Sequence, residues 1–351
     1  MSEAAVRQAF LDQAVICTAA GAPFTGRVCR LLGERLTSDG DIGRRVLGWA
    51  GVPSHQGDAL PLRLMGGLHG LARSGRDAAL SALYPPATAP EDGALWAAMD
   101  HVLVDKGAFL SPWLDGPPQT NEVGRSAALM AGLLVLAERF GLPFALYELG
   151  ASAGLNTVLD GYAYRLGETE AGTAGSPVRL EPRWTGASPP SAKVVVARRA
   201  GVDQNPLDVR DAATRERLSA YVWADQRERL ARLEAALALA AVDPVVIDKA
   251  DAANWLEARL STTLEPGVCR VVMHTIAYQY FPPEVQTRVR ARIEAAGAQA
   301  TDNAPLAWLS FEAASGSVDR RPALDLTIWP GGETTRLAIC QPHGAEIDWK
   351  A

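Results

Sequence analysis

The sequence contains few of the residues that build metal clusters and disulfide frameworks. It has 4 cysteines in 351 residues, and no two of them form a CxxC pair. Zinc clusters and dithiol redox chemistry therefore have no support in the sequence, and no metal site is predicted. We expect Cys17, Cys29, Cys269 and Cys340 to be reduced residues of the hydrophobic core.

An excess of positive charge is also absent. Lys and Arg total 34 against 40 Asp and Glu, and the formal net charge is -6. Proteins that bind a nucleic-acid backbone usually carry a basic field, so this charge balance lowers the expectation of nucleic-acid binding. We expect a small-molecule partner instead.

Long hydrophobic runs are missing as well. No stretch approaches the roughly 18 uninterrupted apolar residues of a membrane-spanning helix, and the first residues lack the basic region and apolar run of a signal peptide. Hydrophobic residues make up 48% and charged residues 21% of the chain, a balance that disfavours disordered and fibrous proteins. These features predict a cytoplasmic protein with no membrane association.

Residues 1–120 show the periodicity of helices. Val28, Leu31, Leu32 and Leu36 recur at helical spacing, and a second such set spans 60–71. Apolar residues at this spacing line one face of a helix, and turn clusters rich in Gly and Pro separate the helices. We predict an N-terminal all-helical region over 1–120.

Residues 121–351 show a different pattern. A helix is predicted after residue 118, and apolar strand candidates then alternate with helices at 144–149, 193–203, 244–248, 268–274 and 306–312. This alternation predicts a parallel sheet with crossover helices. The clearest crossover helix is 215–241, where Leu230, Leu233 and Leu237 form an apolar face.

The chain ends in a predicted β-hairpin. Strand candidates 324–329 and 335–340 flank the glycine turn Pro330-Gly-Gly-Glu333. Together with the five parallel strands, they predict a seven-stranded sheet with one antiparallel strand at or near an edge. The Gly- and Pro-rich stretch near 165–192 is predicted to be an insertion or a long loop, with a small strand over 178–184 as the alternative.

The segment after the first strand carries the best functional signal. Glu148-Leu-Gly-Ala-Ser-Ala-Gly154 ends the strand in an acid and a glycine turn, and Leu155 and Asn156 are expected to start a helix. Such a turn places backbone N–H groups and the positive end of the helix at the carboxyl edge of the sheet. Ligands bind at that edge in open α/β sheets. A tight turn without a ligand is the alternative.

The glycine spacing disfavours a dinucleotide. The G-x-G-x-x-G fingerprint, started at Gly150, requires glycine at the positions that Ser152 and Leu155 occupy. The middle glycine lets the backbone approach a pyrophosphate, so its replacement indicates a ligand without one. A nicotinamide oxidoreductase is therefore disfavoured.

The loop resembles motif I of class I S-adenosylmethionine-dependent methyltransferases, acid-x-G-x-G-x-G. Glu148, Gly150 and Gly154 stand in register with this motif, and Ser152 replaces its central glycine. The resemblance spans residues 122–343 and implies an α/β fold, a Rossmann-like class I methyltransferase sheet, for a domain over 121–351. It also implies S-adenosylmethionine as the cofactor.

The resemblance assigns cofactor contacts to the ends of the next two strands. Asp203 stands where the family has an acid that accepts hydrogen bonds from ribose hydroxyls, and Asp251 stands where an acid meets the adenine amino group. An Asx turn before Pro206 and a helix N-cap are the respective alternatives. The cofactor residues implied are Glu148, Gly150, Ala151, Ser152, Gly154, Asn156, Asp203, Gln204, Asp251 and Ala252.

The reacting end of the site is assigned to other residues. His274 ends the next strand and is expected to face the transferred methyl group. Because histidine titrates near neutral pH, it is the candidate general base, with a structural hydrogen-bonding role as the alternative. Asn121, Arg125 and Tyr278 are assigned to the methionyl end or the substrate. Their alternatives are a helix start for Asn121, an ion pair with Glu122 on the same helical turn for Arg125, and a packing role for Tyr278.

Four strings of residues carry a narrower resemblance. Gln119-Thr-Asn-Glu-Val-Gly-Arg125, 148–156, Val222-Trp-Ala-Asp-Gln-Arg227 and Pro342-His-Gly344 resemble a bacterial family filed as domain of unknown function 2332 and regarded as methyltransferase-like. This resemblance covers most of the chain and implies a fold and a cofactor but no substrate. His69 and His343 are weaker catalytic candidates than His274.

Two functions follow as hypotheses. The first is methyl transfer from S-adenosylmethionine to an unknown small or moderate-sized acceptor, a reaction in which alignment of the reactants supplies much of the catalysis. The second is a non-catalytic nucleoside-binding protein on the same fold. Ser152 and the lack of an acceptor motif such as Asn-Pro-Pro-Tyr after the fourth strand favour the second hypothesis.

Overall fold

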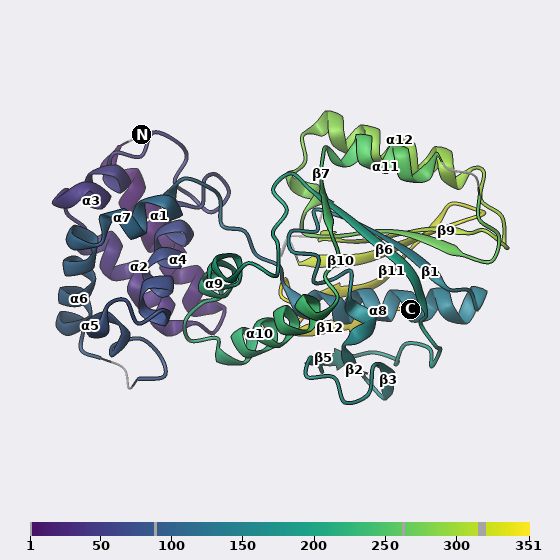
Figure 1. Ribbon diagram of the computed structural model, residues 1–351, viewed down its shortest axis with the longest axis horizontal. Helices are drawn as coiled ribbons and strands as arrows, with labels where there is room; N and C mark the ends of the chain where they lie inside the picture. Colours follow the sequence, from purple (N-terminus) through teal and green to yellow (C-terminus); the bar gives the residue numbers. More distant parts are fainter. Residues whose placement is uncertain (1, 88–89, 262–263, 315–320) are drawn as a thin grey trace. The chain divides into compact units, whose positions relative to one another are not determined.

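The computed structural model describes residues 2–87, 90–261, 264–314 and 321–351 (Figure 1). The chain folds into two compact units. The helical unit holds Met1–Thr120 and Asp211–Ala231, and the sheet unit holds Asn121–Arg210 and Arg232–Ala351. Residues 211–231, which the sequence analysis assigns to the C-terminal domain, therefore fold with the helical unit.

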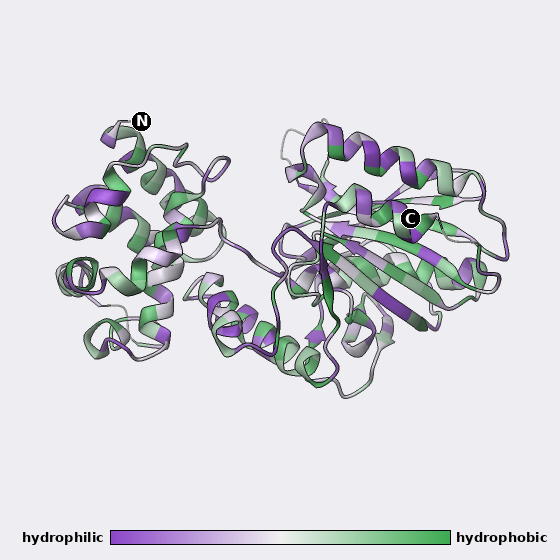
Figure 2. Ribbon diagram, turned by 45° about the horizontal axis from the view of Figure 1, so that its top comes forward, coloured by the Kyte–Doolittle hydropathy of each residue, from purple (hydrophilic) through white to green (hydrophobic). Residues whose placement is uncertain are grey.

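The helical unit confirms the prediction of an N-terminal helical region. Hydrophobic and hydrophilic residues alternate along its helices (Figure 2), as expected for helices that bury one face. Its elements are α1 (Glu3–Ala19), α2 (Pro23–Arg35), α3 (Gly40–Leu47), α4 (Leu60–Arg73), α5 (Ala78–Ser81), α6 (Asp92–Asp105), α7 (Gly107–Leu114) and α9 (Ala212–Tyr221).

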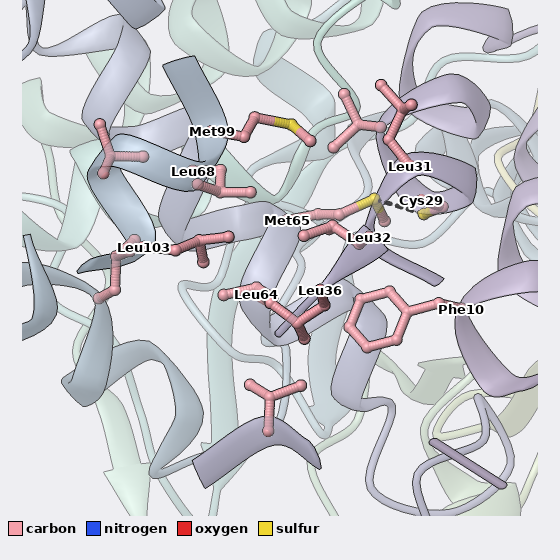
Figure 3. Close-up of a cluster of buried hydrophobic side chains, with 14 of the residues drawn as sticks. Phe10, Cys29, Leu31, Leu32, Leu36, Leu64, Met65, Leu68, Met99 and Leu103 are labelled. Carbon is pink, nitrogen blue, oxygen red and sulfur yellow. Dashed lines mark hydrogen bonds between the residues drawn. The ribbon is translucent and has the colours of Figure 1, made fainter. Parts of the chain in front are cut away.

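The core of this unit is formed by the residues whose periodicity predicts helices. Figure 3 shows Phe10 from α1, Leu32 from α2, Leu64 from α4 and Met99 from α6 in one cluster, and all four side chains are buried. Complete burial of a side chain of this size contributes about 1.5–3 kcal/mol. The apolar faces of α1, α2, α4 and α6 therefore hold the unit together.

The single helix predicted over 215–241 is wrong. The structure has α9 and α10 (Arg227–Val242), separated by a turn that contains Asp225. The Asp225 carboxylate accepts hydrogen bonds from the Phe24 backbone N–H at 2.9 Å and from the Thr25 hydroxyl at 2.7 Å. These contacts satisfy donors at the start of α2, which has no capping side chain of its own. A tertiary contact therefore overrides the helical periodicity.

The sheet unit is built on one large, mostly parallel sheet. In spatial order its strands are β5 (Arg183–Thr185), β12 (Glu346–Trp349), β11 (Glu333–Cys340), β10 (Pro322–Trp329), β9 (Leu306–Ala313), β8 (Cys269–Thr275), β1 (Phe144–Leu149), β6 (Val196–Asp203) and β7 (Ile247–Lys249). The five strands predicted to be parallel are β1, β6, β7, β8 and β9, and each pairs in parallel with its neighbours in this set.

The prediction of seven strands with one antiparallel strand is wrong. The large sheet has nine strands in the described residues, because β12 and β5 extend it beyond the hairpin. β10 runs antiparallel to β9 and β11, and β12 runs antiparallel to β11. β5 and β12 have 3 and 4 residues, which is too short for a strand period to stand out in the sequence.

Helices cover both faces of this sheet. Figure 1 shows α11 (Ala252–Leu260) and α12 (Pro283–Gly297) on one face and α8 (Ser126–Phe140) on the other. α8 is buried along most of its length, whereas α12 buries only Val289, Ile293 and Gly297. Both faces of β1 and β8 are therefore covered, which explains why these strands are buried along their whole length.

The predicted insertion contains strands of its own. β2 (Ala163–Leu166), β3 (Thr169–Gly172) and β4 (Arg179–Leu180) form a small sheet, and β5 joins the large sheet beside β12. The alternative of a strand within 178–184 is therefore realised twice, as β4 and as part of β5.

Two further expectations concern exposure. All four cysteines are buried and take part in no disulfide. Among the helices within the described ranges, none combines the length and the apolar character needed to cross a membrane.

The order of the parallel strands defines where a ligand is expected. Read in chain order, β7, β6, β1, β8 and β9 are arranged 3-2-1-4-5, and the order reverses between β1 and β8. In open α/β sheets the ligand crevice lies outside the carboxyl ends of the strands at this reversal. The residues that follow β1 and β8 are therefore the first to consider as a site.

Candidate functional site

The glycine loop after β1 requires its glycines. Gly150 has φ 69° and Gly154 has φ 75°, values that side chains other than glycine rarely adopt. A Cβ on Gly150 would lie 2.5 Å from the Ala277 Cβ, and a Cβ on Gly154 would lie 2.8 Å from Ile247 Cδ1. The first contact joins the loop after β1 to the loop after β8.

Two non-glycine residues with positive φ flank the strand reversal. Ser152 has φ 54° in the loop after β1, and Ile276 has φ 48° in the loop after β8. A positive φ is unusual for any side chain and strained for a β-branched one such as Ile276. Strained residues of this kind concentrate at ligand sites, where the surrounding structure holds them.

The backbone N–H groups of the glycine loop are bonded within the protein. Asn121 Oδ1 accepts hydrogen bonds from Ala153 N at 3.2 Å and from Leu155 N at 3.0 Å. The other donors bond to backbone oxygens or to a carboxylate: Gly150 and Ala151 to Val202 O, Ser152 to Asp203, and Gly154 to Ala151 O. A pyrophosphate needs such N–H groups, so this geometry agrees with the argument against a dinucleotide.

The helix expected to start at Leu155 is absent. Residues 155–158 form turns and lead into the 3-10 helix η2 (Leu159–Gly161). The Leu155 carbonyl accepts a hydrogen bond from the Tyr162 hydroxyl at 2.6 Å, and the Thr157 hydroxyl donates to Gly154 O at 2.6 Å. Such side-chain bonds compete with helical ones. The positive helix end invoked from the sequence therefore contributes nothing here.

Glu148 is a buried acid at the end of β1. Its Oε1 accepts a hydrogen bond from Asn156 Nδ2 at 3.2 Å, and Asn156 Oδ1 accepts one from the Ser126 hydroxyl at 2.8 Å. Burial raises the pKa of Glu148 to about 8, the negative charge of Asp203 adds to this, and Asn156 and Arg125 oppose it. Glu148 is therefore mostly protonated at neutral pH. The Asn156 side chain is 1% exposed, and its amide is hydrogen-bonded to Glu148.

Two polar atoms beside the loop have no partner. Glu148 Oε2 and Ser152 Oγ are buried without a hydrogen bond within the described chain. An unsatisfied buried polar atom costs about 1–3 kcal/mol unless something else satisfies it. Their position next to the strained loop makes them the side-chain atoms best placed to receive a polar ligand.

Asp203 ends β6 beside the loop. Its carboxylate accepts hydrogen bonds from Ser152 N at 2.9 Å and from Asn205 N at 2.8 Å. The second bond is the Asx turn that the sequence offers as an alternative to ribose binding. Each carboxylate oxygen has a further lone pair, so the turn leaves acceptor capacity for a hydroxyl group. Gln204 is exposed at the same edge.

Asp251 has the geometry of a helix N-cap. Its side chain accepts a hydrogen bond from Asn254 N at 3.0 Å at the start of α11, and Ala252 beside it is buried. Arg288 Nη1 lies 3.6 Å from Asp251 Oδ1. The capping alternative is thus realised. Contact with an adenine stays a prediction.

His274 lies where the sequence places it, at the end of β8, but both of its ring nitrogens are occupied. Nδ1 lies 2.7 Å from Glu312 Oε1, and Nε2 accepts a hydrogen bond from Trp308 Nε1 at 2.9 Å. The side chain is completely buried. The structural alternative named for His274 therefore describes its surroundings better than the general-base hypothesis does.

Glu312, at the end of β9, is a residue of this edge that is not predicted from the sequence. Its Oε1 accepts hydrogen bonds from Ala277 N at 3.0 Å and Tyr278 N at 3.1 Å, in addition to the bond with His274. Burial raises the pKa of Glu312, and these hydrogen bonds outweigh it, so the pKa lies below its usual value. An acid that ends a predicted strand at the carboxyl edge is the signal that could have identified it.

Tyr278 belongs to the same cluster. Its ring stacks on His274 at a centroid distance of 4.9 Å, and its hydroxyl donates to Gln286 O at 2.6 Å. Burial raises the pKa of Tyr278, so the hydroxyl is a poor acid. Together with Glu312, these contacts hold the loop after β8, which contains strained Ile276.

Segment 121–125 connects the loops of this edge. Asn121 holds the glycine loop, as described above, and Arg125 donates to Thr275 O at 3.0 Å and to Pro342 O at 2.9 Å. Glu122 Oε2 lies 3.5 Å from His343 Nδ1. The predicted sites Asn121 and Arg125 therefore lie at the carboxyl edge, and both position backbone there.

Three of the four strings that carry the family resemblance meet at this edge. They are residues 119–125, 148–156 and 342–344. Asn121 bonds to the glycine loop, and Arg125 bonds to Pro342 O. Gly124 lies so close to the third string that a Cβ added to it would be 2.2 Å from His343 O. The fourth string, 222–227, lies in the helical unit, where Asp225 caps α2.

Comparison with protein families gives a match over nearly the whole chain. The profile of a family described as "Uncharacterized protein conserved in bacteria" matches residues 7–349. None of the curated proteins compared with the chain matches it.

Proposed function

The chain belongs to DUF2332, a family of uncharacterized bacterial proteins, and we propose that it is an S-adenosylmethionine-dependent methyltransferase of Rossmann-like class I architecture. The cofactor is proposed to lie at the carboxyl edge between β1 and β8. The acceptor is proposed to be a small or moderate-sized molecule. The family match supports none of these points by itself, and their support comes from the geometry of the site.

One observation carries the proposal. The glycine loop lies at the reversal of strand order, with strained Ser152 on one side and strained Ile276 on the other. A turn that only joins β1 to the next segment needs neither strain nor a second loop pressed against Gly150. This arrangement favours a ligand site over a plain turn.

The residues present fit the chemistry of the cofactor. S-adenosylmethionine has a ribose diol, an adenine and an amino-acid end, but no pyrophosphate. The loop keeps its N–H groups for the protein and leaves Glu148 Oε2 and Ser152 Oγ without partners. Asp203 retains acceptor capacity for a diol. When bound, the cofactor would supply a methyl group on a positively charged sulfur.

The chain would act mainly by holding the reactants. Displacement at a methyl carbon needs the nucleophile in line with the leaving sulfur, and orientation can supply about 7–11 kcal/mol of the barrier. Glu312 holds the loop after β8, and Asn121 holds the loop after β1. Both loops are therefore fixed before a ligand arrives, which is the arrangement that orientation requires.

A non-catalytic nucleoside-binding protein is the second candidate. It is favoured by the contacts of His274, because both ring nitrogens are bonded within the protein and neither is left to take a proton from a methyl acceptor. The two candidates agree on the ligand and differ only in turnover.

Calorimetric titration tests both candidates. We expect S-adenosylmethionine and S-adenosylhomocysteine to bind at one site and NADH to show no heat. Absence of binding by both nucleosides at millimolar concentration would remove the proposal. Binding without methylated product across a panel of thiols, amines, phenols and carboxylates would favour the non-catalytic candidate.

A further inference from the structure

We infer that His343, oriented by Glu122, is the base that takes a proton from the methyl acceptor. The inference rests on the proposed function and assigns a residue to the step that His274 cannot perform as placed. The role applies to acceptors whose nucleophilic atom carries a proton, such as a phenol, an amine or a thiol.

The pair has the geometry of a base and its orienting acid. His343 Nδ1 lies 3.5 Å from Glu122 Oε2, and 26% of the His343 side chain is exposed against 4% of Glu122. A buried carboxylate next to one ring nitrogen orients the imidazole and stabilises its protonated form. At 3.5 Å the two atoms are within ion-pair range but beyond an ordinary hydrogen bond, and such catalytic contacts are often long without a substrate and shorten when it binds.

Glu122 is held in place independently of His343. Its Oε1 accepts a hydrogen bond from Gly124 N at 3.1 Å. The backbones of the two segments touch, because a Cβ on Gly124 would lie 2.2 Å from His343 O and a Cβ on Gly344 would lie 2.3 Å from Gly124 O. Glycine at both positions allows the loop 342–344, which we call the histidine loop, to approach the Glu122 carboxylate.

The pair lies at the candidate ligand site. Arg125 bonds to Pro342 O on one side and to Thr275 O, next to strained Ile276, on the other. Asn121, the neighbour of Glu122, bonds to the glycine loop. The histidine loop is therefore connected to both strained loops through a single short segment.

Three other titratable groups of this edge have contacts that limit their use as a base. Both nitrogens of His274 are bonded, and the Tyr278 hydroxyl donates to Gln286 O. Glu148 is buried, and its pKa of about 8 reflects that burial. His343 is partly exposed and has the Glu122 carboxylate beside it.

The methyl transfer is a direct displacement at the methyl carbon. The electron pair of the acceptor atom forms the bond to the methyl carbon while the bond from that carbon to sulfur breaks, and the sulfur keeps its electrons. The acceptor proton passes to the His343 imidazole, which is paired with Glu122. Solvent then takes the proton from the ring and restores the base.

Chemical modification with diethyl pyrocarbonate, mapped by mass spectrometry, tests the location of His343. His55 and His101 are exposed, whereas His69 and His274 are buried, so three histidines are expected to react in the ligand-free protein. Saturation with S-adenosylhomocysteine should protect His343 at least tenfold and leave His55 and His101 unchanged.

The outcomes separate the inference from the proposed function. If S-adenosylhomocysteine binds by calorimetry and His343 still reacts at its original rate, the inference is wrong and the proposed cofactor stands. The same conclusion holds if His343 does not react in the ligand-free protein. If S-adenosylhomocysteine does not bind, both fail.

Turnover distinguishes a base from a structural residue. His343→Gln should lower kcat by about 10²–10⁴ for acceptors that must lose a proton. Transfer to a carboxylate, which carries none at neutral pH, and the affinity for S-adenosylhomocysteine should not change. His101→Gln is the matched control, because His101 faces Asp105 at 3.3 Å on α6. Equal losses for both acceptor classes would refute the role.

Discussion

The Trp308 indole donates a hydrogen bond to His274 Nε2 over 2.9 Å, and this contact determines the tautomer of the histidine. An indole nitrogen can only donate, so Nε2 must carry a lone pair and the ring proton must lie on Nδ1, facing Glu312. His274 is therefore a neutral donor to a carboxylate.

The first prediction concerns this tautomer. Long-range nitrogen–proton NMR spectra should show the His274 proton on Nδ1 and an unprotonated Nε2 at neutral pH. In Trp308→Phe the Nε2 resonance should shift, because it loses its donor, while Nδ1 stays bonded to Glu312. A proton found on Nε2 in the native protein contradicts the assignment.

The second prediction concerns Glu312. Glu312→Gln retains the size of the side chain but replaces one carboxylate oxygen with an NH₂ group, which cannot accept from the His274, Ala277 and Tyr278 donors. We therefore expect a loss of about 2–3 kcal/mol in the free energy of unfolding. Hydrogen exchange at residues 277–279 should accelerate more than elsewhere. Because the pKa of Glu312 is lowered in the folded state, its contribution is present above the unfolded pKa and is lost as pH falls through the folded one.

Glu333→Gln provides the control for this change. Glu333 is exposed at the start of β11, so the same substitution there should leave both measurements nearly unchanged. Equal effects of the two substitutions would show that the Glu312 hydrogen bonds contribute little.

The third prediction concerns Glu148. Because burial raises its pKa to about 8, its contribution to stability is complete below the unfolded pKa and is lost as pH rises through the folded one. One proton gives a slope of about 1.4 kcal/mol per pH unit in that range. Glu148→Gln should remove this slope from urea unfolding curves between about pH 5 and 8, the interval in which the proton is lost. An unchanged slope would contradict the raised pKa.

The fourth prediction concerns the contact of the two loops. Gly150→Ala combines a positive φ with a Cβ placed 2.5 Å from the Ala277 Cβ, whereas Gly141→Ala meets a positive φ with open space around it. We expect Gly141→Ala to cost about 1 kcal/mol and Gly150→Ala to cost more. Adding Ala277→Gly should recover the difference, as measured in a double-mutant cycle. No recovery would mean that the loops move apart freely.

The parallel strands could be predicted from the sequence because each is a short apolar run bounded by turn residues. β1 occurs at its predicted bounds, and the strand order then locates the glycine loop at the carboxyl edge. The end of that loop could not be predicted, because it depends on the Tyr162 hydroxyl that reaches the Leu155 carbonyl. The helix that local pattern favours is lost to a contact between side chain and backbone.

The role of His274 could not be predicted for a related reason. Its position at a strand end is visible in the sequence, but its partners lie on β9, where Trp308 and Glu312 flank the residue paired with it, Ser310. The register of two strands decides whether the ring is open or occupied. His343 shows the converse, since its carboxylate partner is distant in sequence and close in space.

The fifth prediction separates the two functions of Asp203. Asp203→Asn keeps an oxygen that can accept from Asn205 N or Ser152 N but not the second carboxylate oxygen, so part of the turn survives. If the carboxylate also receives ribose hydroxyls, the substitution should weaken S-adenosylhomocysteine binding by about tenfold or more, corresponding to at least 1.4 kcal/mol. An analogue without the two ribose hydroxyls should bind the native protein and Asp203→Asn with equal affinity. A similar loss for both ligands would assign Asp203 to the turn alone, because a deformed loop weakens every ligand, whereas a missing acceptor weakens only the ligand that donates to it.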